Sequence, residues 1–316
     1  MESDNKKMKA IVCTKSGPPE GLQLKEVLRP EPGDKDVLIK VVAATVTRGD
    51  VILRKMHPLL ALLLGIFGVK RQKIPGVEFA GDISAAGKDV KQFKVGDKVF
   101  GTTTGLRFGA NAEFVCVPEH GRQGVLALMP TNATYEEAAA LPVGGMTALY
   151  LLRKTKIKPG GKILVYGASG SVGTYAVQMA RYAYDARVTG VCSTMNVDLV
   201  KSLGAEKVID YTREEILQSG QTFDVIFDAV GKLSTAKIKS ILTGNGTYLS
   251  VRRPTKELPE DLLALKALFE EGKIKPVIDR RYTLAQVPEA HMYVETGRKK
   301  GNVIISVVDS ESGGNV

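Results

Sequence analysis

Apolar positions along the chain follow two kinds of spacing, which fall in different parts of the sequence. Up to about residue 121, short apolar runs such as 8–13, 37–44 and 112–117 are punctuated by glycine and proline. Runs of this kind predict a small β-rich domain. Farther on, apolar strands alternate with helical patterns, which predicts a doubly wound parallel sheet. The strands expected in that sheet are residues 163–166, 187–192, 208–210, 223–228 and 246–251.

Helix signals lie between and after these strands. Thr134 and Glu137 have the spacing of a capping box, so a helix is expected to begin there. A short helix over residues 51–55 follows the polar turn 45–50. An amphipathic helix is expected over residues 259–271, and a helix over 288–296 and a strand over 302–308 follow it.

Glycines recur at positions 167, 170 and 173, between an apolar run and a helical pattern. Strand, tight turn and helix in this order are typical of a dinucleotide-binding unit. Without a Cβ, Gly170 allows a pyrophosphate to approach the backbone N–H groups at the helix start, and Gly173 allows the helix to pack closely on the strand. The sequence therefore predicts a nucleotide site at this turn.

Composition narrows the class of protein. A chain of 316 residues with 44% hydrophobic and 25% charged residues is long enough for two globular domains. The net charge of +10 comes from lysines and arginines spread along the whole chain, and there is no tryptophan, which argues against nucleic-acid binding. Cys13, Cys116 and Cys192 form no CxxC pair, so neither a disulfide framework nor a structural zinc site is expected.

The same features bear on location. The cysteine usage favours a reducing compartment, and residues 1–7 lack the apolar segment of a secretory signal, so we expect a cytoplasmic protein. The apolar run 59–69 is shorter than the roughly 20 residues that cross a bilayer, so no transmembrane segment is expected. A lid or buried helix is the favoured interpretation of this run, and a surface anchor is the alternative.

A dense set of motifs resembles the medium-chain dehydrogenase/reductase superfamily, in its zinc-independent quinone oxidoreductase-like branch, which is related to the NAD(P)-dependent alcohol dehydrogenases. The resemblance implies a GroES-like catalytic domain of residues 1–121 and 273–316 and a Rossmann NAD(P)-binding domain of residues 122–272. The matching motifs are residues 75–81, 93–101, 136–142, 145–148, 167–173, 203–205, 227–231 and 273–279.

Comparison with zinc-dependent members of this superfamily implies hydride transfer without a metal. Those members carry Gly-His-Glu-x-x-Gly, and Val77 stands here at the position of the histidine ligand. Their first cysteine ligand falls near Thr47, and the four-cysteine lobe after Gly101 is missing. Valine cannot ligate a metal, so we expect no metal site.

The end of the second Rossmann strand bears on the choice of cofactor. NAD enzymes usually carry Asp or Glu there to bind the ribose 2′-hydroxyl, whereas this chain has Cys192, Ser193 and Thr194. Without an acid, repulsion of a 2′-phosphate is removed, which favours NADPH over NADH. The basic residue of many relatives lines up near Asn196. The side chains left to hold the phosphate are those of Ser193, Thr194, Tyr211 and either Lys201 or Arg213.

The resemblance also implies where the reaction occurs. NADPH is expected across the carboxyl ends of the strands, with hydride passing to a quinone or to the β-carbon of an α,β-unsaturated carbonyl. Thr47, Arg48 and Asp50 are the candidate catalytic residues, with the proton coming from solvent or Thr47; Asp50 could equally be a helix N-cap. The expected cofactor-binding residues are Thr147, Gly167, Ala168, Ser169, Gly170, Ser171, Val172, Gly173, Cys192, Ser193, Thr194, Tyr211, Ala229, Val230 and Asn302.

One departure from the family concerns assembly. Relatives often pair two subunits through a sixth sheet strand, but only about seven residues separate the strand 246–251 from the helix 259–271. The sheet is therefore expected either to end at five strands or to share residues 248–252 with the missing element, and a homodimer stays an open alternative.

Two other classes of protein are alternatives to this interpretation. A short-chain dehydrogenase requires Tyr-x-x-x-Lys downstream of the glycine turn, but Tyr150 and Lys154 lie upstream of it. A sensor or structural protein that binds NADPH without turnover is the remaining alternative to an enzyme. His57, His120 and His291 are far apart in the sequence and predict no general acid.

Overall fold

The computed structural model describes residues 7–56, 73–106, 109–120, 123–213 and 220–307. The chain divides into a first compact unit, Met1–Pro142 with Ile278–Val316, and a second unit, Val143–Val277. The first unit extends beyond residue 121 because helix α3 (Tyr135–Ala140) packs on its strands, and it resumes at Ile278 and not at residue 273. The functional division at 121 and 272 stays a prediction, and the apolar run 59–69 and His57 lie outside the described residues.

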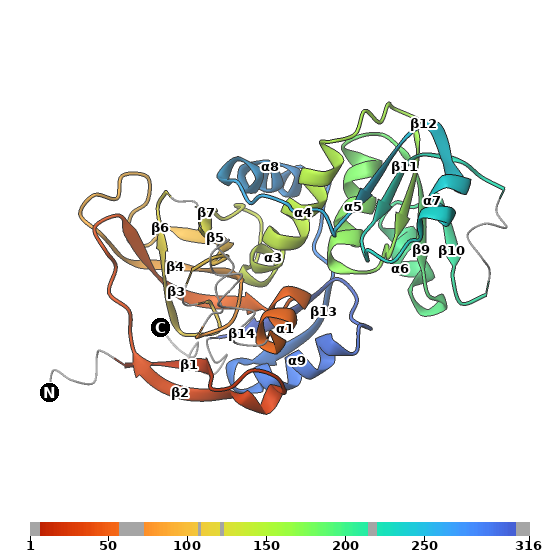
Figure 1. The fold of residues 1–316 in the computed structure, drawn as a ribbon. Helices are drawn as coiled ribbons and strands as arrows, with labels where there is room; N and C mark the ends of the chain where they lie inside the picture. The colour runs from red at the N-terminus through yellow and green to blue at the C-terminus, as the bar shows by residue number, and fades with distance from the viewer. Residues whose placement is uncertain (1–6, 57–72, 107–108, 121–122, 214–219, 308–316) are drawn as a thin grey trace, which may run out of the picture. The chain divides into compact units, whose positions relative to one another are not determined.

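The first unit is β-rich, as the sequence predicts. In its described part a seven-stranded sheet has the order β13-β14-β3-β4-β5-β7, with β6 also paired to β3, and β1 and β2 form a two-stranded sheet. Figure 1 shows the C-terminal elements, in blue, beside the N-terminal strands of this unit. The strands are β1 Lys7–Cys13, β2 Leu22–Leu28, β3 Asp36–Thr45, β4 Glu78–Ala86, β5 Lys98–Thr102, β6 Phe114–Pro118, β7 Val125–Leu128, β13 Ile278–Thr283 and β14 Asn302–Ser306, and the helices besides α3 are α1 Arg48–Lys55 and α9 Val287–Glu295.

The core of the first unit forms because both kinds of periodicity supply apolar faces. Inward positions such as Ile39 and Phe79 are fully buried. Val287, Ala290 and Val294 lie three and four residues apart on α9, so they share the helix face that enters the same core. This packing brings α9 against α1, which lies at the candidate catalytic turn.

Several expected strands differ in their bounds, among them 302–308, which ends at Ser306. The motif 75–81 leads into β4, which begins only at Glu78, because the carbonyl groups of Ile74 and Pro75 accept hydrogen bonds from Gly109 and Asn111 and not from a neighbouring strand. The strand expected at residues 246–251 begins at Leu242, directly after α7, and ends at residue 250.

The second unit holds the parallel sheet, in the order β10-β9-β8-β11-β12. The strands β9 and β10 are added on one side of β8, and the next strand in the chain, β11, pairs on its other side. This change in strand order between β8 and β11 is the usual position of a ligand site in open α/β folds. The strands are β8 Lys162–Tyr166, β9 Arg187–Cys192, β10 Lys207–Asp210, β11 Phe223–Asp228 and β12 Leu242–Ser250, and the helices are α4 Pro142–Leu152, α5 Ser171–Tyr182, α6 Val197–Ser202, α7 Thr235–Ile241 and α8 Pro259–Glu270.

The sheet ends at β12 in the part of the chain that the structure describes, so the first of the two alternatives for the shortened segment holds there. Side chains along β12 are mostly half-buried or exposed until its last two residues. Within the described residues, no helix is long and apolar enough to cross a membrane.

Candidate functional site

The candidate catalytic turn in the first unit is built around a capping box. Thr47 is the N-cap of α1, and its Oγ1 accepts a hydrogen bond from the Asp50 amide at 3.2 Å. In return, Asp50 Oδ2 accepts hydrogen bonds from the Thr47 amide at 2.7 Å and from Thr47 Oγ1 at 2.6 Å. The interpretation of Asp50 as the N-cap is therefore wrong: Asp50 is the third helical residue, because the threonine hydroxyl three positions earlier reaches its amide first.

The carboxylate of Asp50 also joins α1 to the loop before β4. Its Oδ1 accepts the Gly76 amide hydrogen bond at 3.2 Å, and the side chain is buried. Burial raises the pKa of Asp50, while the hydrogen bonds from Thr47 and Gly76 oppose that rise. Both carboxylate oxygens are thus engaged in positioning backbone, and a catalytic role for Asp50 stays a prediction.

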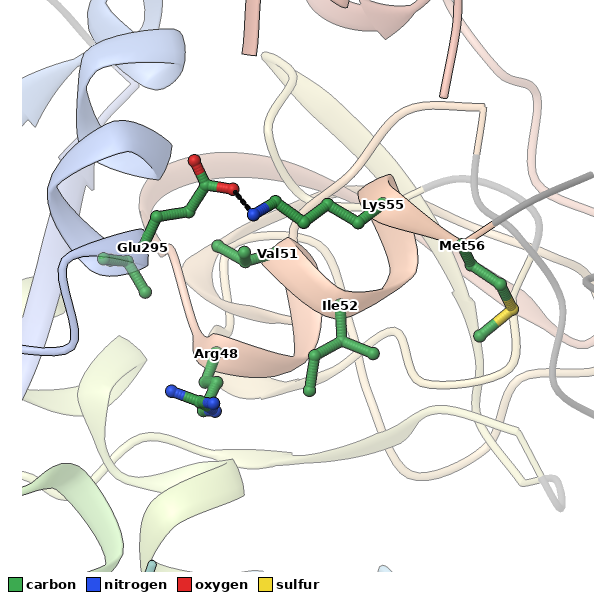
Figure 2. A pocket seen from close by; sticks show the side chains of 7 residues that line it. Arg48, Val51, Ile52, Lys55, Met56 and Glu295 are labelled. Carbon is green, nitrogen blue, oxygen red and sulfur yellow. Dashed lines mark ion pairs between the residues drawn. The ribbon is translucent and has the colours of Figure 1, made fainter. Parts of the chain in front are cut away.

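A pocket of about 390 Å³ lies beside this turn, entirely within the first unit. Figure 2 shows Arg48 and Ile52 on one side of α1 and the ion pair of Lys55 with Glu295, at 2.5 Å, on the other. Arg48 is exposed and has no ion pair within the described part of the chain. The residues that line the pocket are Arg48, Val51, Ile52, Lys55, Met56, Val294 and Glu295.

Behind the pocket, the helices α1 and α9 are joined by a buried ion pair. Arg54 Nη2 lies 2.5 Å from Glu295 Oε1, and the Arg54 side chain is almost fully buried. His291 on α9 is also buried, and burial lowers its pKa to about 3. His291 is therefore neutral at physiological pH. His120 is exposed beside Glu119, at 3.6 Å, so the two described histidines form no shared acid–base group.

The first residue of β14 lies opposite the candidate turn. Ile304 pairs with Thr45 in the antiparallel register, and the Val46 amide donates to the Val303 carbonyl at 3.1 Å. When the register is continued one residue beyond Val46 and Val303, Asn302 falls opposite Thr47. Asn302 is buried, and the structure therefore brings this expected cofactor residue to the same edge of the first unit as the expected catalytic residues.

Two polar residues near this edge have no signal in the sequence. Asn111 is fully buried beside Pro75, whose carbonyl accepts its amide hydrogen bond at 2.9 Å, and its side-chain amide has no partner among the described residues. The amino group of Lys299 donates to the Gly301 carbonyl at 2.5 Å, and burial lowers its pKa to about 8 although Glu78 and Asp279 raise it. Both lie in irregular segments, where periodicity gives no information.

The glycine turn of the second unit fits a nucleotide pyrophosphate. Gly170 is the N-cap of α5 and supplies no capping side chain, so the helix start offers backbone donors to an anion. A Cβ built on Gly170 would meet nothing closer than the Gly167 carbonyl oxygen at 3.6 Å, so the space above it is open. A Cβ on Gly173 would lie 2.1 Å from that same oxygen, which explains why only glycine allows this close packing.

The loop after β11 lies against this turn. A Cβ on Gly167 would lie 2.3 Å from Val230 Cγ2, and the Ala229 amide donates to the Tyr166 carbonyl at 2.9 Å. Asp228 orders the loop by accepting the Val230 amide hydrogen bond at 3.0 Å. The expected residues Ala229 and Val230 are therefore beside the expected pyrophosphate site.

Helix α4 packs against the start of α5. A Cβ built on Gly144 would lie 2.3 Å from Ser171 Oγ, which places the two helices in close contact. Thr147 lies one helical turn farther along α4 and is half-buried. This expected cofactor residue thus lies on the helix that borders the glycine turn.

The ends of β9 and β10 form a polar cluster. Ile209 pairs with Val191 and Asp210 with Cys192, and the Thr194 hydroxyl donates to Asp210 Oδ2 at 2.5 Å. The carboxylate of Asp210 therefore lies beside the expected phosphate-binding residues, although no acidic residue comes directly after β9 in the sequence. The neighbouring strand supplies it.

Asn196 joins this cluster to the glycine turn. Its Nδ2 lies 3.2 Å from both Ser169 Oγ and Ser193 Oγ, so it donates to either hydroxyl. Tyr211 is exposed, and its amide donates to the Cys192 carbonyl at 3.1 Å. The structure thus brings the expected cofactor residues of the second unit to the carboxyl edge of the sheet.

A metal site requires several His, Cys, Asp or Glu side chains close together. Among the residues that the structure describes, no three or more His, Cys, Asp or Glu side chains form a group that could hold a metal ion.

Known proteins resemble this chain over most of its length. A family model for the alcohol dehydrogenase GroES-like domain matches residues 33–131, and one for zinc-binding dehydrogenases matches residues 203–263 and 252–305. The chain is 35% identical over 318 residues to a 2-methylene-furan-3-one reductase of Solanum lycopersicum, covering 94% of this chain and 79% of the relative. It is 34% identical over 321 residues to a chloroplastic NADPH-dependent alkenal/one oxidoreductase of Arabidopsis thaliana, covering 95% of this chain and 80% of the relative.

Among solved structures, the quinone oxidoreductase from Coxiella burnetii superposes with a TM-score of 0.82 at 27% identity. That match covers 96% of this chain and 100% of the other.

Proposed function

Because the chain belongs to the medium-chain dehydrogenase/reductase superfamily, among its quinone and enone oxidoreductases, we propose that it transfers a hydride from NADPH to a quinone or an α,β-unsaturated carbonyl. The observation that carries the proposal is the open cradle at Gly170, at the start of α5. The names of the relatives support the acceptor class, since they include an alkenal/one oxidoreductase and a quinone oxidoreductase.

The residues of the second unit bind and orient the cofactor, which supplies the hydride when bound. Residues 169–173 receive the pyrophosphate through backbone donors. Val230 and Thr147 border the same turn and limit where the nicotinamide end can lie. Ser193 and Thr194 lie at the end of β9, where the ribose 2′ substituent is expected.

The residues of the first unit bind the acceptor. The pocket on α1 and α9 has an apolar lining of Val51, Ile52 and Val294, which suits an apolar acceptor and excludes water. The Arg48 guanidinium is the free cation of this lining among the described residues, so we assign it to the acceptor's carbonyl oxygen. Because the Thr47 hydroxyl already donates to Asp50, we assign the proton to solvent.

Three finer points belong to this proposal. Preference for NADPH over NADH is supported by the absence of an acid directly after β9 and by the name of the Arabidopsis relative. Zinc independence is supported by Val77 and Thr47, which stand where the zinc-dependent members have ligands. Cytoplasmic location stays a prediction, since that relative is chloroplastic.

The test is the loss of absorbance at 340 nm when the purified protein is mixed with NADPH, or separately NADH, and a panel of quinones and enones. Turnover that favours NADPH is the expected result. Nucleotide binding without turnover of any acceptor would contradict the proposed oxidoreductase activity and support the alternative of a sensor that binds NADPH. Absence of nucleotide binding would contradict both.

A further inference from the structure

A carboxylate lies where the ribose 2′ substituent of a bound dinucleotide is expected. Asp210 ends β10 and pairs in register with Cys192, the last residue of β9. In dinucleotide-binding folds the 2′ substituent is recognised just beyond that last residue of the second strand. Here that position leads into Thr194, and the Thr194 hydroxyl donates to Asp210 Oδ2 at 2.5 Å.

The carboxylate is held in place by several donors. Its Oδ1 accepts hydrogen bonds from the Thr212 amide at 3.0 Å and the Thr212 hydroxyl at 2.7 Å. The Thr194 and Thr212 hydroxyl oxygens lie 2.8 Å apart, with the single proton of each directed to the carboxylate. The hydrogen bond from Thr194 is the largest cause that lowers the pKa of Asp210, so the group is ionised at neutral pH.

One cation accompanies this charge. Arg213 Nε lies 3.6 Å from Asp210 Oδ2, and the Arg213 side chain is 74% exposed. The pair is therefore loose and open to solvent, and Arg213 can turn toward an incoming anion while Asp210 stays fixed. A 2′-phosphate carries a charge near −2 at neutral pH, so it is repelled by Asp210 and attracted by Arg213, whereas a 2′-hydroxyl is affected by neither to the same degree.

We propose that Asp210 determines the selectivity between NADP and NAD at this site, because its fixed charge weakens binding of a 2′-phosphate and leaves binding of a 2′-hydroxyl nearly unchanged. This inference rests on the proposed nucleotide binding and adds a negative determinant to it. Arg213 offsets part of the repulsion and is the positive member of the pair.

The test is calorimetric titration of the full chain and of Asp210→Asn with NADP⁺, NAD⁺ and 2′,5′-ADP, which needs no turnover. Two unit charges about 7 Å apart near a protein surface interact enough to change a dissociation constant several-fold. We expect Asp210→Asn to bind NADP⁺ and 2′,5′-ADP about three- to tenfold more tightly, with less than about a twofold change for NAD⁺. The gain should shrink as salt is added.

The matched control is Asp224→Asn. Asp224 lies near the amino end of β11, is exposed and accepts the Lys162 amide hydrogen bond at 2.9 Å. The variant therefore removes the same charge at the end of the strands opposite to Asp210. This variant should bind all three ligands as the unchanged chain does. Asp210→Glu keeps the charge, so its ratio of NADP⁺ to NAD⁺ affinity should stay near that of the unchanged chain.

An equal change for NADP⁺ and NAD⁺ in Asp210→Asn, no change, or weaker NADP⁺ binding would overturn the inference. If Asp210→Asn does not fold, Arg213→Gln decides: NADP⁺ must weaken about three- to tenfold with NAD⁺ unchanged, and equal effects on both would overturn it. If the unchanged chain binds no nucleotide, the proposed function itself fails. Normal binding and turnover with an unaltered ratio in the variants would remove this inference alone.

Discussion

The two units each contain a threonine–aspartate pair, and the pairs behave in opposite ways. In the first unit, Thr47 and Asp50 hydrogen bond within one turn of α1, and burial raises the pKa of Asp50. In the second unit, Thr194 and Asp210 hydrogen bond between neighbouring strands, and donors lower the pKa of Asp210. The same contact thus positions backbone in one place and, in the other, holds a charged carboxylate at the proposed nucleotide site.

The difference follows from what surrounds each carboxylate. Asp50 bonds to Gly76 and is enclosed by the first unit, so its charge has little access to solvent. The Asp210 side chain is also mostly buried, at 12% exposed, but it lies at the end of β10 beside the exposed Arg213 and accepts several hydrogen bonds that stabilise its charge. A short threonine–aspartate contact therefore does not by itself indicate catalysis, binding or structure.

Removal of the buried carboxylate should have the largest effect. Asp50→Ala eliminates the capping box and the bond to Gly76, and we expect the free energy of unfolding to fall by about 2–3 kcal/mol. Urea unfolding followed by circular dichroism measures it. The Kd for NADP⁺ should stay unchanged in the folded protein, and a loss below about 0.5 kcal/mol would contradict the structural role.

Substitution of the threonine in each pair should affect stability in the first unit and ligand affinity in the second. Thr47→Val should cost about 1–2 kcal/mol in the free energy of unfolding, because the N-cap acceptor is lost. Thr194→Val should cost less and should instead alter the affinity for 2′,5′-ADP, since its partner faces the nucleotide site. Both values come from the same denaturation and titration series. Equal stability losses with unaltered ligand affinity would remove the distinction.

The arginine beside each pair should act on a different ligand. Arg48→Gln should raise KM for an enone about three- to tenfold and leave the Kd for NADP⁺ unchanged, because Arg48 lines the acceptor pocket. Steady-state kinetics with a saturating cofactor measures this change. Lys9→Gln, an exposed change in the same unit, is the control and should have no effect. A change in NADP⁺ affinity with Arg48→Gln would contradict the assignment.

The smallest effect is the dependence of stability on pH. The raised pKa of Asp50 gives a contribution that is present below the ordinary value of 3.8 and lost as the pH rises through the folded-state pKa. The lowered pKa of Asp210 gives a contribution that is present above 3.8 and lost as the pH falls through the folded-state pKa. Relative to Asp50→Asn, the unchanged chain should gain stability as the pH falls, and relative to Asp210→Asn it should lose stability.

Urea unfolding over a series of pH values for the three proteins gives both differences, and the contributions of all other groups cancel in them. Differences with the same sign for Asp50→Asn and Asp210→Asn would contradict the opposite environments of the two carboxylates.

Sequence reasoning succeeded where structure is local. The strands at 187–192 and 223–228 have the predicted bounds, because each is a short segment rich in β-branched and apolar residues, of the length typical of a strand. The capping box of Thr134 and Glu137 is confirmed, since both partners lie within one helical turn. The alternative that Asp50 is the N-cap is wrong because Thr47, three residues earlier, caps α1, and the position of a polar residue near a helix start does not by itself show which residue is the cap.

The sequence by itself determined the order of the two units, the glycine turn and the capping box at Thr134, since the turn and the capping box each depend on residues within a few positions of one another. Only the tertiary structure decided that Asp210 meets Thr194, that Asn196 bridges to Ser169 and that the described sheet ends at β12. These contacts join segments far apart in the chain, and strand pairing and register bring them together. Periodicity identifies each strand but not the side chains that meet across its end.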